Sequence, residues 1–107
     1  MDIYMTVSTY DYEIYATPHL TKGGAYLEML HDLMEFLGIE NNQAAEIEAF
    51  VEWCGDGFDV SAMMKMDIDT DPEELRSATG HLYEYIVETD RICNQYSCEV
   101  IRKQIQP

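Results

Sequence analysis

The chain has 107 residues and a formal net charge of −15, because 21 aspartates and glutamates oppose only six lysines and arginines. Hydrophobic residues make up 47% of it and include eight tyrosines and seven methionines, which suffices for one folded domain over residues 1–107 and argues against a disordered acidic tail. The charge disfavours direct binding to nucleic acid or anionic lipid, and without an apolar leader or long apolar run we expect a soluble, cytoplasmic protein.

The N-terminal segment predicts a β-hairpin. Within residues 2–17, apolar Ile3, Met5 and Val7 alternate with polar and aromatic residues, and this period of two is typical of a strand. Residues 18–24 contain a proline and a pair of glycines, so we expect a loop there.

The next segment predicts the first of two short acidic helices, over about residues 25–37. Leucines and a methionine recur on one face, and the carboxylates Glu28, Asp32 and Glu35 lie on the opposite face. Gly38 is well placed to end this helix.

The second acidic helix is predicted over about residues 42–53. We expect its apolar residues, including Val51, to point inward, and Glu48 and Glu52 to point outward. Residues 54–58 contain two glycines and predict a loop.

Residues 59–68 allow two interpretations. Their apolar residues alternate as in a strand, which we favour, whereas Ser61 could cap a short helix instead. The acidic run that follows predicts a helix start, with Asp71 as the N-cap and Pro72 at the first helical position.

The helix from Pro72 is expected to reach at least Asn94. It either continues to Ile105 or gives way to a turn and a last strand over residues 97–105. We therefore predict an α+β fold with an N-terminal β-hairpin, two short acidic helices, an extra strand as an option, and a long C-terminal helix. The tyrosines predicted to support a homodimer through this helix are Tyr83, Tyr85 and Tyr96.

No sequence motif predicts an enzyme, a cofactor or a metal site. The serines lie in no nucleophile motif, the glycines form no phosphate-binding loop, and three cysteines without an export signal indicate reduced thiols. Asp67, Asp69 and Asp71 match the first half of a calcium loop, but Pro72 and Ala78 stand where that loop needs glycine and glutamate. A helix-capping turn explains the same residues.

The distribution of acids is the most informative feature. Fourteen of the 21 carboxylates lie between Glu28 and Glu74 with Lys65 as the single base, which gives this stretch a formal charge of −13. Carboxylates three or four residues apart on a helix have Cβ atoms about 5–6 Å apart, comparable to neighbouring phosphates of a nucleic-acid strand. We therefore expect a basic, nucleic-acid-binding protein as the partner. The candidate partner-binding residues are Glu28, Asp32, Glu35, Glu48, Glu52, Asp56, Asp59, Asp67, Asp69 and Asp71.

In size, acidity and lack of motifs the chain resembles the anti-CRISPR and anti-restriction proteins of phages and plasmids. The resemblance covers composition and length only. It implies an inhibitor in the cytoplasm of a host cell that blocks a nucleic-acid-binding enzyme with a phosphate-mimicking carboxylate surface. The alternatives are an adaptor or antitoxin-like protein that binds a basic partner through the Tyr-rich hairpin or the long helix, a small divalent-ion-dependent enzyme, and acids that serve solubility alone.

Overall fold

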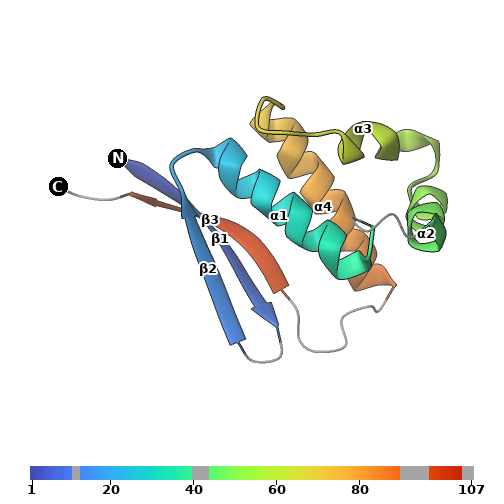
Figure 1. The fold of residues 1–107 in the computed structure, drawn as a ribbon, viewed down its shortest axis with the longest axis horizontal. Coiled ribbons are helices and arrows are strands. Elements are labelled where there is room, and N and C mark those ends of the chain that lie inside the picture. Colours follow the sequence, from blue (N-terminus) through green and yellow to red (C-terminus); the bar gives the residue numbers. More distant parts are fainter. Residues whose placement is uncertain (11–12, 40–43, 90–96, 105–107) are drawn as a thin grey trace.

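The computed structural model describes residues 1–10, 13–39, 44–89 and 97–104. These form the predicted α+β fold, a three-stranded antiparallel sheet beside a group of helices (Figure 1). None of the helices in the described ranges has the length and apolar character that crossing a bilayer requires. In chain order the elements are β1 (Asp2–Tyr10), β2 (Glu13–His19), α1 (Lys22–Leu37), α2 (Ala44–Cys54), the 3-10 helix η1 (Gly55–Gly57), α3 (Val60–Met64), α4 (Pro72–Glu88) and β3 (Ser97–Gln104).

The sheet has the order β2-β1-β3, so the N-terminal strand is central and antiparallel to both neighbours. In this register Thr6 lies opposite Thr17 of β2 and Val100 of β3. Helix α1 packs on one face of the sheet, and α4 packs against α1. The short helices α2 and α3 lie on the far side of this helix pair from the sheet (Figure 1).

The hydrophobic core lies mainly between α1 and α4 and extends to α2 and α3. Its most buried member among the aromatics is Phe50 of α2, whose ring contacts those of Trp53, Phe58 and Tyr85. The other large side chains with no exposed area are Leu30, Leu33, Ile39, Met63, Leu75, Leu82 and Ile86.

Side-chain caps explain where the helices begin and end. The hydroxyl of Thr21 accepts a hydrogen bond from the backbone N–H of Gly24 at 3.0 Å, and the Asp71 carboxylate accepts one from Glu73 at 2.8 Å. Gly38 ends α1 in the left-handed region with φ of 79°, where glycine avoids the Cβ clash. The predicted roles of Gly38 and Asp71 are thus confirmed.

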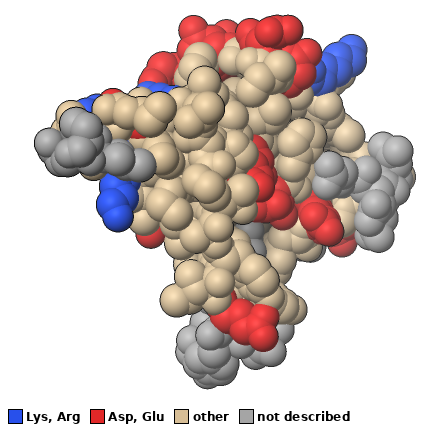
Figure 2. Space-filling model, turned by 60° about the vertical axis from the view of Figure 1, so that its left-hand side comes forward, with Lys and Arg blue, Asp and Glu red and all other residues tan. Residues whose placement is uncertain are grey.

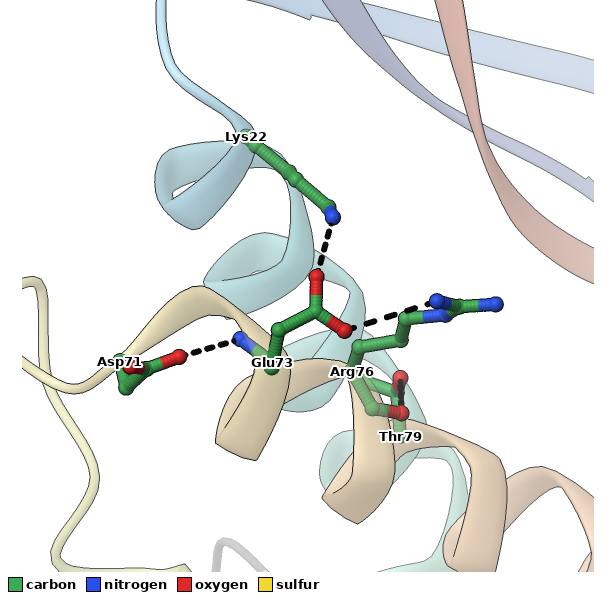
Figure 3. A network of polar contacts seen from close by, with 5 residues as sticks. All are labelled: Lys22, Asp71, Glu73, Arg76 and Thr79. Atoms are coloured by element: carbon green, nitrogen blue, oxygen red, sulfur yellow. Dashed lines mark hydrogen bonds and ion pairs between the residues drawn. The ribbon is translucent and has the colours of Figure 1, made fainter.

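An ion-pair network joins the starts of α1 and α4 (Figure 3). Glu73 accepts a hydrogen bond from Lys22 of α1 and lies 3.5 Å from Arg76 Nη1 on its own helix. This contact lowers the pKa of Glu73 and raises that of Lys22. One turn further along α4, the hydroxyl of Thr79 donates to the carbonyl oxygen of Arg76 at 2.7 Å.

The predicted loop over residues 18–24 is wrong at both ends. Strand β2 continues to His19 and α1 already begins at Lys22, so both glycines of this segment are helical. Thr21 caps the helix earlier than the apolar pattern indicates. Gly23 is buried, and a Cβ there would lie 3.6 Å from Pro72 Cγ, an ordinary van der Waals contact, so the starts of α1 and α4 lie close together.

The favoured strand over residues 59–68 is also wrong. Helix α3 occupies Val60–Met64, and Asp59 rather than Ser61 caps it by accepting a hydrogen bond from Ala62 N at 3.0 Å. Val60 and Met63 are three residues apart, so a single helical turn buries both.

The segment just before α3 differs from its prediction in two details. Cys54 ends α2, and the predicted loop contains the 3-10 helix η1. Val51 is 45% exposed rather than inward, because one residue along a helix rotates the side chain about 100° away from that of buried Phe50.

Helix α4 ends at Glu88, earlier than the predicted Asn94. Thr89 closes it, with a hydroxyl that donates to the Tyr85 carbonyl oxygen at 2.6 Å. Continuation to Ile105 is wrong, and the alternative of a last strand is confirmed by β3. Tyr85 is only 2% exposed and belongs to the core, so it is not available for the predicted dimer contact, and Tyr96 lies outside the described residues.

Candidate partner-binding groove

A hollow of about 620 Å³ lies between α1 and the first two strands. We call it the α1–hairpin groove. Its lining residues are Ser8, Tyr10, Tyr15, Thr17, Glu28, Asp32, Glu35 and Phe36. It therefore combines three carboxylates from the predicted set with three aromatic rings and two hydroxyls.

Two regular spacings bring these side chains together. Glu28, Asp32 and Glu35 lie four and three residues apart on α1, so they form a stripe along one side of the helix. On the strands, alternation places Ser8 and its direct cross-strand partner Tyr15 on the same face of the sheet, toward α1. The groove thus has an acidic wall from α1 and a hydroxyl and aromatic wall from the hairpin.

The acidic wall is partly held in place. Glu28 Oε2 lies 2.9 Å from His19 Nε2 at the end of β2, and both side chains are partly buried. Asp32 is half-buried, whereas Glu35 is exposed at the other end of the stripe.

The aromatic wall carries a second carboxylate contact. The Tyr15 hydroxyl donates a hydrogen bond to Glu13, and this bond, together with the nearby negative charge, raises the pKa of Tyr15. At the opposite side the rings of Tyr10 and Phe36 meet edge to face, with centroids 6.4 Å apart. The rings therefore have fixed neighbours and present stable surfaces to the groove.

This arrangement suits a cationic side chain. A guanidinium group forms charge-assisted hydrogen bonds with carboxylates and stacks on aromatic rings, and both kinds of group line the groove. The described lining includes three carboxylates and neither lysine nor arginine. The chemistry of the groove therefore matches arginine or lysine from a basic partner.

The remaining predicted site residues lie along the segment from α2 to the start of α4, and we call them the second acidic group. All of them are exposed, and none lines the α1–hairpin groove. The structure therefore does not bring the ten predicted residues into one site. The second group consists of Glu48 and Glu52 on α2, Asp56 in η1, Asp59 before α3, and Asp67, Asp69 and Asp71 before α4.

Three aspartates of this second group accept hydrogen bonds from backbone N–H groups. Asp59 and Asp71 cap helices, and Asp67 Oδ1 accepts a hydrogen bond from the backbone N–H of Asp69 at 2.9 Å. These bonds confirm the capping turn that the sequence predicts before α4. They also leave these carboxylates less free to reorient toward a partner than Glu48 or Glu52.

The sequence reasoning missed the aromatic wall of the groove. The sequence names the Tyr-rich hairpin only as a binding surface of the adaptor or antitoxin-like alternative and does not join its tyrosines to the acidic site. Phe36 follows Glu35 on α1, but Tyr10 and Tyr15 come from β1 and β2, so only the folded chain shows that these two tyrosines lie near the α1 acids. Cross-strand pairing of the hairpin was the one signal that could have linked Tyr15 to the vicinity of β1.

Comparisons of the chain with protein-family models, with curated proteins and with solved structures found no match. The function must therefore be argued from the geometry of the chain itself. Over the described ranges, no group of three or more histidine, cysteine, aspartate or glutamate side chains is arranged to hold a metal ion.

Proposed function

We propose that this protein is a small acidic inhibitor that blocks a nucleic-acid-binding enzyme, in the manner of anti-CRISPR and anti-restriction proteins. The observation that carries the proposal is the α1–hairpin groove, where three carboxylates stand beside three aromatic rings. The net charge of −15 makes a basic protein the natural partner. The basic residues that grip phosphate on such an enzyme are the groups that this groove can bind.

The groove would bind by replacing phosphate with carboxylate. An arginine that enters it can form paired hydrogen bonds with Asp32 or Glu35 and stack on Tyr10 or Tyr15. The spacing of the α1 acids, about 5–6 Å between Cβ atoms, allows neighbouring basic residues to be engaged at once. Nucleic acid and inhibitor then compete for the same cations.

The second acidic group would act mainly at a distance. Exposed acids such as Glu48, Glu52 and Asp56 add to the negative field of the molecule. Such a field speeds the encounter with a basic surface, and at physiological salt its reach is limited to a Debye length of about 8 Å. We therefore assign specificity to the groove and attraction to the second group.

The test compares two variants with equal change in charge. The groove variant carries Glu28→Gln, Asp32→Asn and Glu35→Gln. The matched control carries the same kinds of substitution at the second group: Glu48→Gln, Glu52→Gln and Asp56→Asn. Wild-type protein immobilised as bait is first used to capture CRISPR and restriction complexes from lysates at low salt. Affinity and enzyme inhibition are then measured with the purified target.

We expect the groove variant to lose at least about a hundredfold in affinity, because a hundredfold corresponds to about 2.8 kcal/mol, the contribution of one or two charge-assisted contacts at roughly 1.5–3 kcal/mol each. The control should lose only the affinity that long-range attraction contributes, and its affinity should equal that of the wild type at high salt. Competing DNA should displace the target from the wild-type protein. Equal affinity of the two variants for the target would refute the assignment of the groove.

The adaptor or antitoxin-like alternative uses part of the same surface. Tyr10 and Tyr15 belong to the hairpin that this alternative invokes. Binding that survives high salt and competing DNA, but fails with Tyr15→Leu, would favour that alternative over phosphate mimicry.

A further inference from the structure

Strands β1 and β2 turn hydroxyl groups toward the helices and aliphatic side chains away from them, whereas β3 turns Cys98 and Val100 toward the core. On the covered face the hydroxyl of buried Thr6 donates to the carbonyl oxygen of Ala25 in α1 at 2.7 Å, and Ser8 and Thr17 line the α1–hairpin groove. An antiparallel sheet with one covered face normally shows the reverse pattern, with apolar residues under the helix. In β1 and β2 the aliphatic side chains instead lie on the outer face, which indicates that this face has a covering of its own.

Alternation along the three strands defines this outer face, which we call the open face. No described helix packs on it, because all of them lie on the other side of the sheet (Figure 1). Its side chains are Ile3, Met5, Val7 and Thr9 of β1, Ile14, Ala16 and Pro18 of β2, and Ser97, Glu99, Ile101 and Lys103 of β3.

The open face is mainly apolar along β1 and β2, and several of its side chains are exposed. Ile14 is 74% exposed and Ile101 43%, and Leu20, just after β2, is 73% exposed beside Ile3 and Pro18. A contiguous apolar surface of this kind on a single chain marks an interaction site. In the space-filling view, uncharged surface lies between acidic groups at the top, in the middle and near the lower end of the molecule (Figure 2).

We propose that a second copy of this chain covers the open face, so that two sheets pack face to face. Among the described residues this face carries one acid, Glu99, and one base, Lys103, although the whole chain has a charge of −15. A basic partner would find almost no acid here, and an anionic membrane would repel the chain. A copy of the same neutral, apolar face meets neither obstacle.

The charges of β3 also fit a twofold arrangement. An axis lying across the strands places β3 of one copy over β3 of the other, running in the opposite direction. If the two Ile101 side chains meet near the axis, Glu99 of each copy faces Lys103 of the other, because both lie two residues from Ile101. The interface then has an apolar centre and two ion pairs at its rim.

The available area fits a weak dimer. Three strands about 4.8 Å apart and up to nine residues long make a face of at most roughly 14 by 30 Å, or about 420 Å² per copy. Two such faces bury about 840 Å², at the small end of specific interfaces. Packed at about 10 Å, they would form a β-sandwich with the helices outside.

The experiment measures self-association of the full chain by sedimentation velocity over a range of concentrations. Ile14→Lys adds a charge to the open face, and Val51→Lys adds the same charge to an exposed apolar site on α2, 45% exposed, as the matched control. Circular dichroism and thermal unfolding check that both variants fold. A second pair of variants, Glu99→Lys alone and Glu99→Lys with Lys103→Glu, tests the proposed ion pairs.

We expect a dimer. Ile14→Lys should lower its affinity about a hundredfold, because the twofold symmetry places this substitution at two positions in the interface. Val51→Lys should change the affinity little. Glu99→Lys should weaken the dimer about tenfold and the double variant should restore it. Added salt should strengthen the dimer, since it screens the repulsion between the copies, whereas it should weaken binding through the groove. A monomer at millimolar concentration, or equal effects of Ile14→Lys and Val51→Lys, would overturn the proposal without affecting the proposed inhibitor function.

Discussion

Replacement of Phe50 by alanine should loosen the attachment of α2 to the rest of the molecule. Phe50 is fully buried, and its ring lies 5.1 Å from that of Tyr85 on α4, 6.2 Å from Trp53 and 6.3 Å from Phe58. Truncation of a buried phenylalanine costs about 3–5 kcal/mol. Because three ring contacts are lost together, we expect about 4 kcal/mol, a large share of the roughly 5–15 kcal/mol that stabilises a domain.

The assay is urea unfolding at 25 °C, followed in parallel by circular dichroism and by fluorescence. Trp53 is the only tryptophan of the chain and stacks on Phe50, so its emission reports this contact directly. Val51→Ala, at an exposed neighbouring position, is the control and should change the free energy of unfolding by less than about 0.5 kcal/mol. A loss of less than about 1 kcal/mol for Phe50→Ala would refute the packing described for α2.

Three further predictions concern the ends of the helices. Asp71→Ala should lower the free energy of unfolding by about 1 kcal/mol in urea titrations, because the Glu73 N–H loses its hydrogen-bond acceptor. Asp71→Asn should retain most of the wild-type stability, because asparagine also caps helices. Gly38→Ala should cost about 1–2 kcal/mol in the same assay, because φ is 79° there, and an unchanged midpoint would contradict the left-handed end of α1. The hydrogen bond from Lys22 lowers the pKa of Glu73. The contribution of Glu73 to the free energy of unfolding is therefore present above the ordinary glutamate pKa and is lost as the pH falls through the lowered pKa. Thermal unfolding of Glu73→Gln should therefore differ from wild type at neutral pH but not in strong acid.

Local signals in the sequence predicted those parts of the fold that depend on neighbouring residues. The alternation in β1, the glycine at position 38 and the Asp71-Pro72 pair each act within a few residues, and the structure uses all three as predicted. The segment after Asp59 was assigned wrongly because five helical residues are too few to distinguish a period of two from a helical turn.

Features that depend on packing between distant segments were beyond the sequence. The end of α4 is such a case, because its apolar rhythm continues past Glu88 while the chain leaves the helix to place β3 beside β1. The α1–hairpin groove is another. The sequence predicts its acids as candidates, but Tyr10 and Tyr15 reach them only through the pairing of the hairpin and its packing under α1.

The aspartates that cap backbone groups divide the acidic residues into two kinds with different freedom to change. Asp59, Asp67 and Asp71 hold the starts and turns of the helical half, so even a change that preserves the overall charge, such as aspartate to glutamate, would disturb the chain locally. Glu48 and Glu52 accept no such backbone hydrogen bond among the described contacts, so another acidic residue on the same surface can replace either of them. A survey of tolerated substitutions should therefore find the first group fixed in residue type and the second fixed only in charge, and this contrast would separate acids kept for folding from acids kept for attraction.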